Sequence, residues 1–157
     1  MSSSKRHIEA MDKIASLVSV RERTCREVRN RLLKQGFTEE EADEAVESAV
    51  ASGLLSEERF TRAFIRGKVS LGWGRSKIVE RLEQDGVDDA LVDACSDEFP
   101  SGEEEYQMAL HELSRRSTSS SDPYASYMRR LVGKGYSYDV AERAVCAYLG
   151  RGGELGW

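Results

Sequence analysis

The 157 residues include 23 Lys and Arg against 28 Asp and Glu, which gives a formal net charge of −5, and 39% of them are hydrophobic. This is enough for a sizeable core, either in one globular domain or in a short array of modules. No apolar run is long enough to cross a bilayer, and the N-terminus leads into a charged amphipathic segment instead of a signal-peptide core, so we expect a cytoplasmic protein.

The predicted helices have recognisable start and stop signals. The first is expected from about Ser4 to Ser19, within an N-terminus that we expect to be frayed around Lys5 and Arg6. Thr24 and Glu27 fit a capping box, in which each side chain accepts a hydrogen bond from the other residue's backbone N–H. The helix that they open ends at Gly36, because glycine readily takes the left-handed conformation that follows a helix.

A second capping box, from Thr38 to Glu41, opens the next helix, and Gly53 ends it. Ser56 is expected to cap a further helix, which ends near Gly72. The apolar stripe of that helix is formed by Phe60, Ala63, Phe64 and Val69.

Trp73 lies between two glycines and is expected to form a corner between two helices. Gly74 or Ser76 can cap the helix after it, which carries Ile78 and Leu82 as its apolar face. A further helix is predicted from about Asp88 to Phe99.

The C-terminal third opens after the break at Pro100–Gly102. A helix there carries Tyr106, Ala109, Leu110 and Leu113 on its apolar face. The serine-rich segment 117–121 is expected to be a flexible linker. Asp122 and Pro123 then begin another helix, Ser137 caps the last one, and residues 150–157 are expected to form a frayed tail.

A threefold repeat underlies these helices. The pattern Leu-x-x-x-Gly followed by an apolar residue ends at Gly36, Gly86 and Gly135, which are 50 and 49 residues apart. Each copy has an arginine directly before the leucine. An apolar or aromatic residue lies four positions before the same leucine. Small or apolar residues follow six and nine positions after each glycine. A helix that ends at each glycine and a second helix after a short turn satisfy this spacing.

The sequence therefore predicts an all-α fold of three tandem three-helix repeats in an elongated, curved, right-angled helical array. The expected boundaries are residues 1–52, 53–100 and 101–150, with a flexible tail at 151–157. Charge alternates along the same repeat: residues 59–82 carry seven cations and one carboxylate, and residues 83–105 carry ten carboxylates and no cation.

Cysteine and histidine give no sign of a metal site. Cys25, Cys95 and Cys146 are far apart and lack Cys-x-x-Cys spacing, so reduced thiols are expected, with Cys95 buried. His7 and His111 each stand alone. No nucleophile, base and orienting group can be recognised together, and no cofactor is indicated.

Several of these segments resemble the RecX family of RecA regulators. The resemblance covers about residues 14–96 and is carried by Val20-Arg21-Glu22-Arg23-Thr24, Glu27-Val28, Arg31-Leu32, Gly53-Leu54-Leu55, Arg59-Phe60, Phe64-Ile65, Gly72-Trp73-Gly74, Ile78, Leu82 and Gly86-Val87. In the third repeat only the segment from Met128 to Tyr136 is similar. Ser56-Glu57 stands where the family commonly has an acidic pair, and Arg75 where it often has proline, but both keep the helix-start chemistry.

The resemblance implies a small monomeric protein that binds RecA filaments along their groove and restrains strand exchange, ATP hydrolysis and co-protease activity without catalysis of its own. The expected contact residues for RecA, the RecA–ssDNA filament or DNA are mainly cations of the basic segments. They are Arg21, Arg23, Arg31, Arg59, Arg62, Arg66, Lys68, Trp73, Arg75, Lys77, Arg81 and Arg130.

Two alternatives remain open from the sequence. Trp73 is equally consistent with a packing role at the corner and with a contact to a partner. A stand-alone helical nucleic-acid-binding module is the second functional interpretation, although the acidic net charge predicts only weak direct DNA binding at physiological salt.

Overall fold

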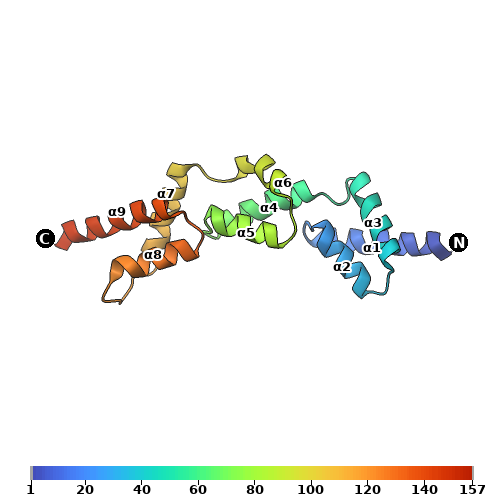
Figure 1. The fold of residues 1–157 in the computed structure, drawn as a ribbon, viewed down its shortest axis with the longest axis horizontal. Helices are drawn as coiled ribbons and strands as arrows, with labels where there is room; N and C mark the ends of the chain where they lie inside the picture. Colours follow the sequence, from blue (N-terminus) through green and yellow to red (C-terminus); the bar gives the residue numbers. More distant parts are fainter. Residues whose placement is uncertain (1, 157) are drawn as a thin grey trace. The chain divides into compact units, whose positions relative to one another are not determined.

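The computed structural model describes the backbone of residues 2–156 and the side chains of residues 3–150. Within residues 2–156 it contains no strand, so the all-α prediction is confirmed. The helices are α1 (Ser2–Val20), α2 (Cys25–Lys34), α3 (Glu39–Ala51), α4 (Glu57–Ser70), α5 (Arg75–Gln84), α6 (Asp89–Ala94), a 3-10 turn (Ser96–Glu98), α7 (Gly102–Arg115), α8 (Pro123–Gly133) and α9 (Tyr138–Gly156) (Figure 1).

These helices form two compact units. The first contains the residues up to Phe64 together with Leu82–Cys95, and the second contains Ile65–Arg81 together with the residues from Ser96 onward. Helices α4 and α5 therefore contribute residues to both units. The three repeat boundaries predicted above, and the shape of the whole array, stay predictions.

Each unit has its own core. In the first unit, α1 packs against α2 and α3 around Ile14, Leu32 and Ala45. In the second unit, α7 packs against α8 and α9 around Leu113, Leu131 and Ala144. All six of these side chains are fully buried.

The repeated pattern occupies equivalent places in the three copies. The anchoring leucines Leu32, Leu82 and Leu131 are fully buried, and the glycine after each adopts a positive φ, between 84° and 102°. The next residue then donates its N–H back to the leucine carbonyl at 3.0–3.1 Å, as a Schellman turn requires. The small residues six and nine positions after each glycine are also buried, so the repeat inferred from the sequence is confirmed.

Most of the predicted caps are present. Thr38 and Glu41 form the full capping box, and the hydroxyls of Ser56 and Ser137 accept from Arg59 N and Val140 N at 3.2 Å. The prediction for Thr24 is half wrong. Its hydroxyl accepts from Glu27 N, but the Glu27 carboxylate binds Arg21 and Arg23 instead of the Thr24 backbone, because an ion pair is available to it.

Four further expectations need correction. The helix predicted from Asp88 to Phe99 is divided into α6 and the 3-10 turn, which places Phe99 in a buried position. On α4, Ala63 is exposed and Phe64 is half-buried. The buried side chains of this helix include Phe60, Thr61 and Ile65. The buried face of α4 is therefore rotated relative to the predicted apolar stripe.

Arg6 does not lie in a frayed terminus. Helix α1 begins at Ser2, and the Arg6 guanidinium donates to Glu41 at 3.1 Å and to the Gly36 carbonyl at 3.0 Å while lying 4.3 Å from the Phe37 ring centroid. At the other end, helix α9 continues to Gly156 through most of the segment expected to be a tail.

Candidate functional site

The tryptophan corner is part of the second unit. Helix α4 ends at Ser70, Gly72 takes a φ of 84°, and the Trp73 N–H donates back to the Lys68 carbonyl at 3.0 Å, which closes the end of the helix. Helix α5 starts directly afterwards at Arg75, with the Gly74 carbonyl accepting from Ile78 N. The corner is therefore a helix end and a helix start separated by four residues.

This corner is hydrogen-bonded to the turn between α8 and α9. The Gly74 N–H donates to the Lys134 carbonyl at 2.7 Å, and the Ser76 N–H donates to the Gly135 carbonyl at 3.1 Å. Side chains add two more bonds, from the Tyr136 hydroxyl to the Gly72 carbonyl at 2.7 Å and from Lys134 Nζ to the Leu71 carbonyl at 3.2 Å. Polar backbone groups that the two turns leave unpaired are thus satisfied by each other.

The two backbones approach so closely that neither can carry a side chain at the contact. A Cβ built on Gly74 would lie 2.3 Å from the Gly135 carbonyl carbon, and one built on Gly135 would lie 2.5 Å from Lys77 Cβ. The glycines of the Gly-Trp-Gly motif and of the third repeat are therefore parts of one contact, in addition to their local roles in helix ends.

Trp73 packs at the corner and keeps part of its ring exposed, so both roles considered from the sequence stay open. Its side chain is half-buried, with Lys68 Nζ 4.6 Å and Lys77 Nζ 4.1 Å from the ring centroid, both within cation–π range. The ring therefore holds two of the predicted contact cations beside the corner. It also lines an open groove of about 880 Å³, whose other walls include Leu71, Met108, His111 and Lys134.

A buried carboxylate lies at the base of this groove. Glu112 of α7 is 6% exposed and forms ion pairs with Arg115 at 3.1 Å and with Lys134 at 3.6 Å. A Cβ on Gly72 would collide with its Oε1 atom. A charge so deeply buried needs such partners to be tolerated. Glu112 could not be recognised from the sequence, because nothing in helix α7 alone shows that the corner covers it.

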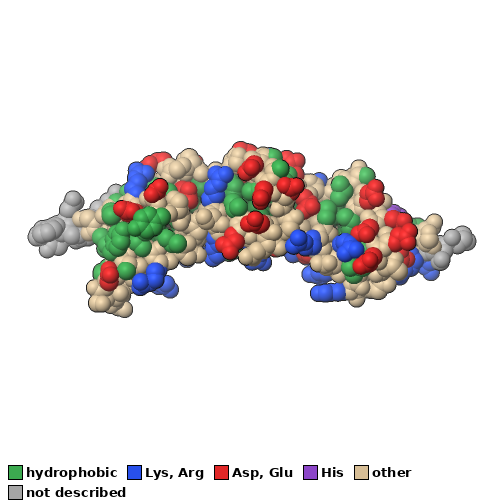
Figure 2. Space-filling model, in the orientation of Figure 1, with side chains coloured by type: hydrophobic (Ala, Val, Ile, Leu, Met, Phe, Trp, Pro, Cys, Tyr) green, Lys and Arg blue, Asp and Glu red, His purple; other side chains and the backbone are tan. Residues whose placement is uncertain are grey.

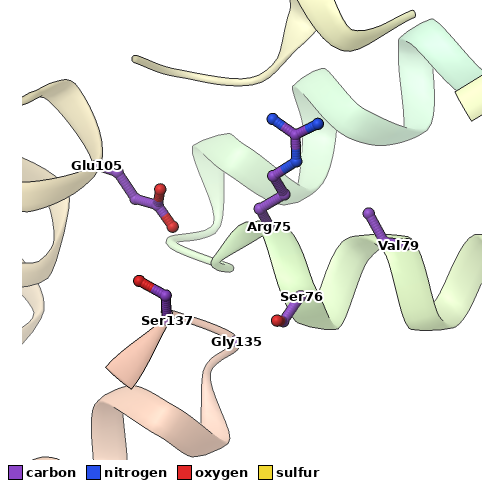
Figure 3. A pocket seen from close by; sticks show the side chains of 6 residues that line it. All are labelled: Arg75, Ser76, Val79, Glu105, Gly135 and Ser137. Carbon is purple, nitrogen blue, oxygen red and sulfur yellow. The ribbon is translucent and has the colours of Figure 1, made fainter. Parts of the chain in front are cut away.

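A second, smaller pocket of about 340 Å³ lies at the start of α5 (Figure 3). Glu105 of α7 extends into it and accepts a hydrogen bond from the Arg75 backbone N–H, whereas the Arg75 guanidinium points away from Glu105 and lies 4.5 Å from the Phe99 ring centroid. Burial raises the pKa of the Glu105 carboxyl above its usual 4.5, against the lowering effects of the Arg75 N–H and charge.

The structure brings together two of the predicted contact residues of the basic helices. Arg66 on α4 forms an ion pair with Glu98 at 2.8 Å, next to the Phe99 ring that Arg75 covers. In the first unit, Arg59 pairs with Glu22 at 3.0 Å and donates to two loop carbonyls, and Arg62 pairs with Glu58 at 3.3 Å. Several of these cations therefore have structural partners.

The remaining predicted residues differ in exposure. Arg21 and Arg23 share the Glu27 carboxylate, and Arg23 is only 6% exposed, so it serves the fold. Burial opposes ionisation of Glu27, but its hydrogen bond from Arg23 and the charges of both arginines hold its pKa below the usual value. Arg31 and Arg81 are exposed, and Arg130 is half-buried with its guanidinium 5.1 Å from the Tyr127 ring centroid.

The thiols and histidines are not assembled into a site. Within the described part of the chain, Cys25, Cys95 and Cys146 form no disulfide, and no cluster of three His, Cys, Asp or Glu side chains is arranged to hold a metal ion. Cys95 is fully buried, as predicted. Burial, and then the neighbouring Glu57 charge, raise the pKa of Cys25 to about 11, which keeps it a thiol. None of the described helices has the length and apolar character needed to cross a lipid bilayer.

Fold and site together define an all-helical repeat protein whose most distinctive feature is a groove and corner lined by cations. Family models described as the first and second three-helix domains of RecX match residues 10–48 and 56–95. The chain belongs to the RecX family.

Similarity to named proteins and to a solved structure supports this assignment. A protein named regulatory protein RecX from Pseudomonas savastanoi pv. phaseolicola is 31% identical over 143 residues, which cover 88% of each chain. Another of that name from Ectopseudomonas mendocina is 32% identical over 132 residues, covering 81% of this chain and 86% of that protein. The crystal structure of RecX from Lactobacillus salivarius has the same fold, with a TM-score of 0.80 at 15% identity over 92% of this chain and 97% of that one.

The closeness of the two backbones generates a stability prediction. Gly74→Ala should destabilise the protein by about 2 kcal/mol or more, because the new methyl group must displace the Gly135 backbone. The matched control is Gly67→Ala on α4, where nothing lies within 4 Å of the added Cβ; it should raise stability by up to about 1 kcal/mol through helix propensity. Urea unfolding followed by circular dichroism measures both. Equal stability of the two variants would contradict the contact.

Glu105 generates a pH prediction. Its carboxyl has a higher pKa in the folded protein than in the unfolded chain, so its contribution to stability is largest below pH 4.5 and is lost as the pH rises through the raised value. Glu105→Gln keeps an acceptor for the Arg75 N–H and does not titrate. The melting temperature of the variant relative to wild type should therefore increase between about pH 4 and pH 7. A difference that is constant with pH, or that decreases, would be inconsistent with the burial of this carboxyl.

Proposed function

We propose that this protein binds RecA, chiefly as the RecA–ssDNA filament, and inhibits its recombinase, ATPase and co-protease activities. Through that inhibition it modulates DNA repair, recombination and the SOS response in the cytoplasm, acting as a monomer and without enzymatic activity. Membership of the RecX family, whose matching relatives are named regulatory proteins, supports this proposal.

The distribution of charge is the structural observation that carries the proposal. This acidic chain presents cations in groups. In the second unit, Arg66 pairs with Glu98, and Arg75 lies over the neighbouring Phe99 ring. Two lysines, Lys68 and Lys77, lie over the Trp73 ring. Figure 2 shows acidic and basic side chains interspersed on the face that it draws. Such a mixed surface favours a partner with both signs of charge, such as a protein filament on DNA, over bare phosphates.

The second candidate is a stand-alone helical nucleic-acid-binding module. The grouped cations favour it, and the net charge of −5 opposes it, because phosphate binding is strongest for a basic protein at low salt. Direct DNA binding that stays strong at physiological salt without RecA would select this alternative.

Partner preference provides the first functional test. In co-sedimentation at physiological salt, binding to RecA filaments on single-stranded DNA should be at least about tenfold tighter than binding to the same DNA alone. The comparison also follows RecA ATP hydrolysis, which should fall as the protein is added. Equal affinity for filament and naked DNA would overturn the filament assignment.

The cations beside the corner provide the second test. Arg66→Ala combined with Arg75→Ala should weaken filament binding and flatten its salt dependence, because two exposed charges are lost from neighbouring positions. Their contacts are surface contacts, so the unfolding free energy should change by less than about 1 kcal/mol. The matched control is Lys5→Ala with Lys13→Ala, which removes two exposed charges from α1.

Two outcomes would reject the electrostatic assignment. One is an equal loss of filament binding in the test pair and in the control pair, which would mean that only net charge matters. The other is normal binding in both pairs together with complete loss in a folded Trp73→Ala variant, which would make the tryptophan an aromatic hot spot.

A further inference from the structure

A basic pocket of about 360 Å³ lies in the second unit, where the ends of α7 and α8 meet. It is lined by four cations, Arg115 and Arg116 at the end of α7, Arg130 of α8 and Lys134 at the cap of α8, and by the carboxylate of Glu112. Only Arg130 was among the contact residues expected from the sequence. The other three cations come together because the ends of α7 and α8 meet.

The Glu112 carboxylate and the backbone carbonyls at the end of α7 neutralise only part of the positive charge of these four cations. Glu112 pairs with both Arg115 and Lys134, and the Arg130 guanidinium donates to the Arg116 carbonyl at the end of α7. A helix C-terminus is equivalent to about half a negative charge, and one carboxylate supplies one more. The positive charge of the four cations therefore exceeds the negative charge that the pocket itself supplies. Arg115 remains 59% exposed and Arg116 is also exposed, so both can reach a ligand.

We propose that this pocket binds a backbone phosphate of single-stranded nucleic acid. Arg115, Arg116 and Arg130 would donate to the phosphate oxygens, and Lys134 would contribute charge from the pocket wall. The inference rests on the proposed function in one respect, since a RecA filament is the source that would supply such a strand, but the pocket itself is assigned by the geometry of the second unit.

The chemistry of the lining favours a phosphodiester over a free phosphate. Glu112 places a negative charge in the wall, and it repels a doubly charged phosphate ion more than a singly charged phosphodiester. The pocket also continues into the larger groove, because Glu112, Arg115 and Lys134 line both.

The larger groove offers a place for the next nucleotide. Leu71, which is 57% exposed, and Met108 line it together with the half-buried Trp73 ring. An unpaired base can lie against such apolar and aromatic side chains, whereas a base within a duplex is covered by its neighbours. The combination of a cationic pocket and an apolar groove therefore fits a single strand.

The test compares two charge reversals in the full-length protein. Arg116→Glu changes a pocket residue, and the matched control Arg129→Glu makes the same charge change on an exposed residue of α8 that does not line the pocket. Fluorescence anisotropy with a labelled oligo(dT) measures affinity across a range of low salt concentrations, and circular dichroism checks the fold. Arg116→Gln serves as a milder second variant.

We expect Arg116→Glu to weaken oligo(dT) binding by about tenfold or more and Arg129→Glu by less than about threefold. Arg116→Gln should lower the slope of log affinity against log salt by about 0.7, the value for one phosphate contact on a single strand. Inorganic phosphate should displace the oligonucleotide only through its contribution to ionic strength, as a chloride control at equal ionic strength would show.

Three results would overturn the proposal. The first is the absence of oligo(dT) binding by the wild-type protein at low salt. The second is an equal effect of Arg116→Glu and Arg129→Glu, which would indicate diffuse electrostatics. The third is specific displacement by inorganic phosphate beyond the chloride control, which would assign the pocket to a free phosphate ligand.

Measurements with RecA separate this proposal from the proposed function. If Arg116→Glu loses oligo(dT) binding while the wild-type protein neither binds nor inhibits RecA filaments, the pocket stands and the RecA role falls. If the wild-type protein inhibits RecA and Arg116→Glu binds oligo(dT) normally, the RecA role stands and the pocket assignment is wrong.

Discussion

The second unit depends on direct contact between two backbone turns. The corner at Gly72–Ser76 and the turn at Lys134–Tyr136 exchange hydrogen bonds as short as 2.7 Å, with no Cβ at either glycine of the contact. That contact covers Glu112, fixes the start of α5 and forms a wall of the large groove. The candidate site is consequently a product of how one repeat meets the next.

The first unit uses a different contact at the equivalent position. There the Arg26 guanidinium, near the start of α2, donates to the Gln84 carbonyl at 3.0 Å and lies against Gly86. In the first unit, the Arg26 side chain therefore makes the connection between turns. In the second unit, backbone N–H and carbonyl groups make the equivalent connection. The middle repeat takes part in both, which agrees with α4 and α5 contributing residues to both units.

Some cations hold parts of the fold together, and others lie at open grooves. Arg6, Arg23 and Arg59 hold helices and loops together through Glu41, Glu27 and Glu22, and such positions are poor sources of free charge for a partner. The arginines around Glu112 line an open pocket, and the two lysines beside Trp73 lie over a ring that lines the larger groove. Localised cations of this kind give a protein basic surfaces without making it basic overall.

The helices, the glycines that end them and the buried leucines of the repeat could be predicted from the sequence alone, because caps, C-terminal turns and helical periodicity are local properties. The sequence also indicated the RecX family and the corner at Trp73. It could not place Glu112 or assemble Arg115, Arg116 and Lys134 with Arg130, because those residues meet through contacts between helices distant in the chain. Which cations pair with carboxylates and which line a groove depends on tertiary contacts, since ion pairs form between whichever charges packing brings within about 4 Å.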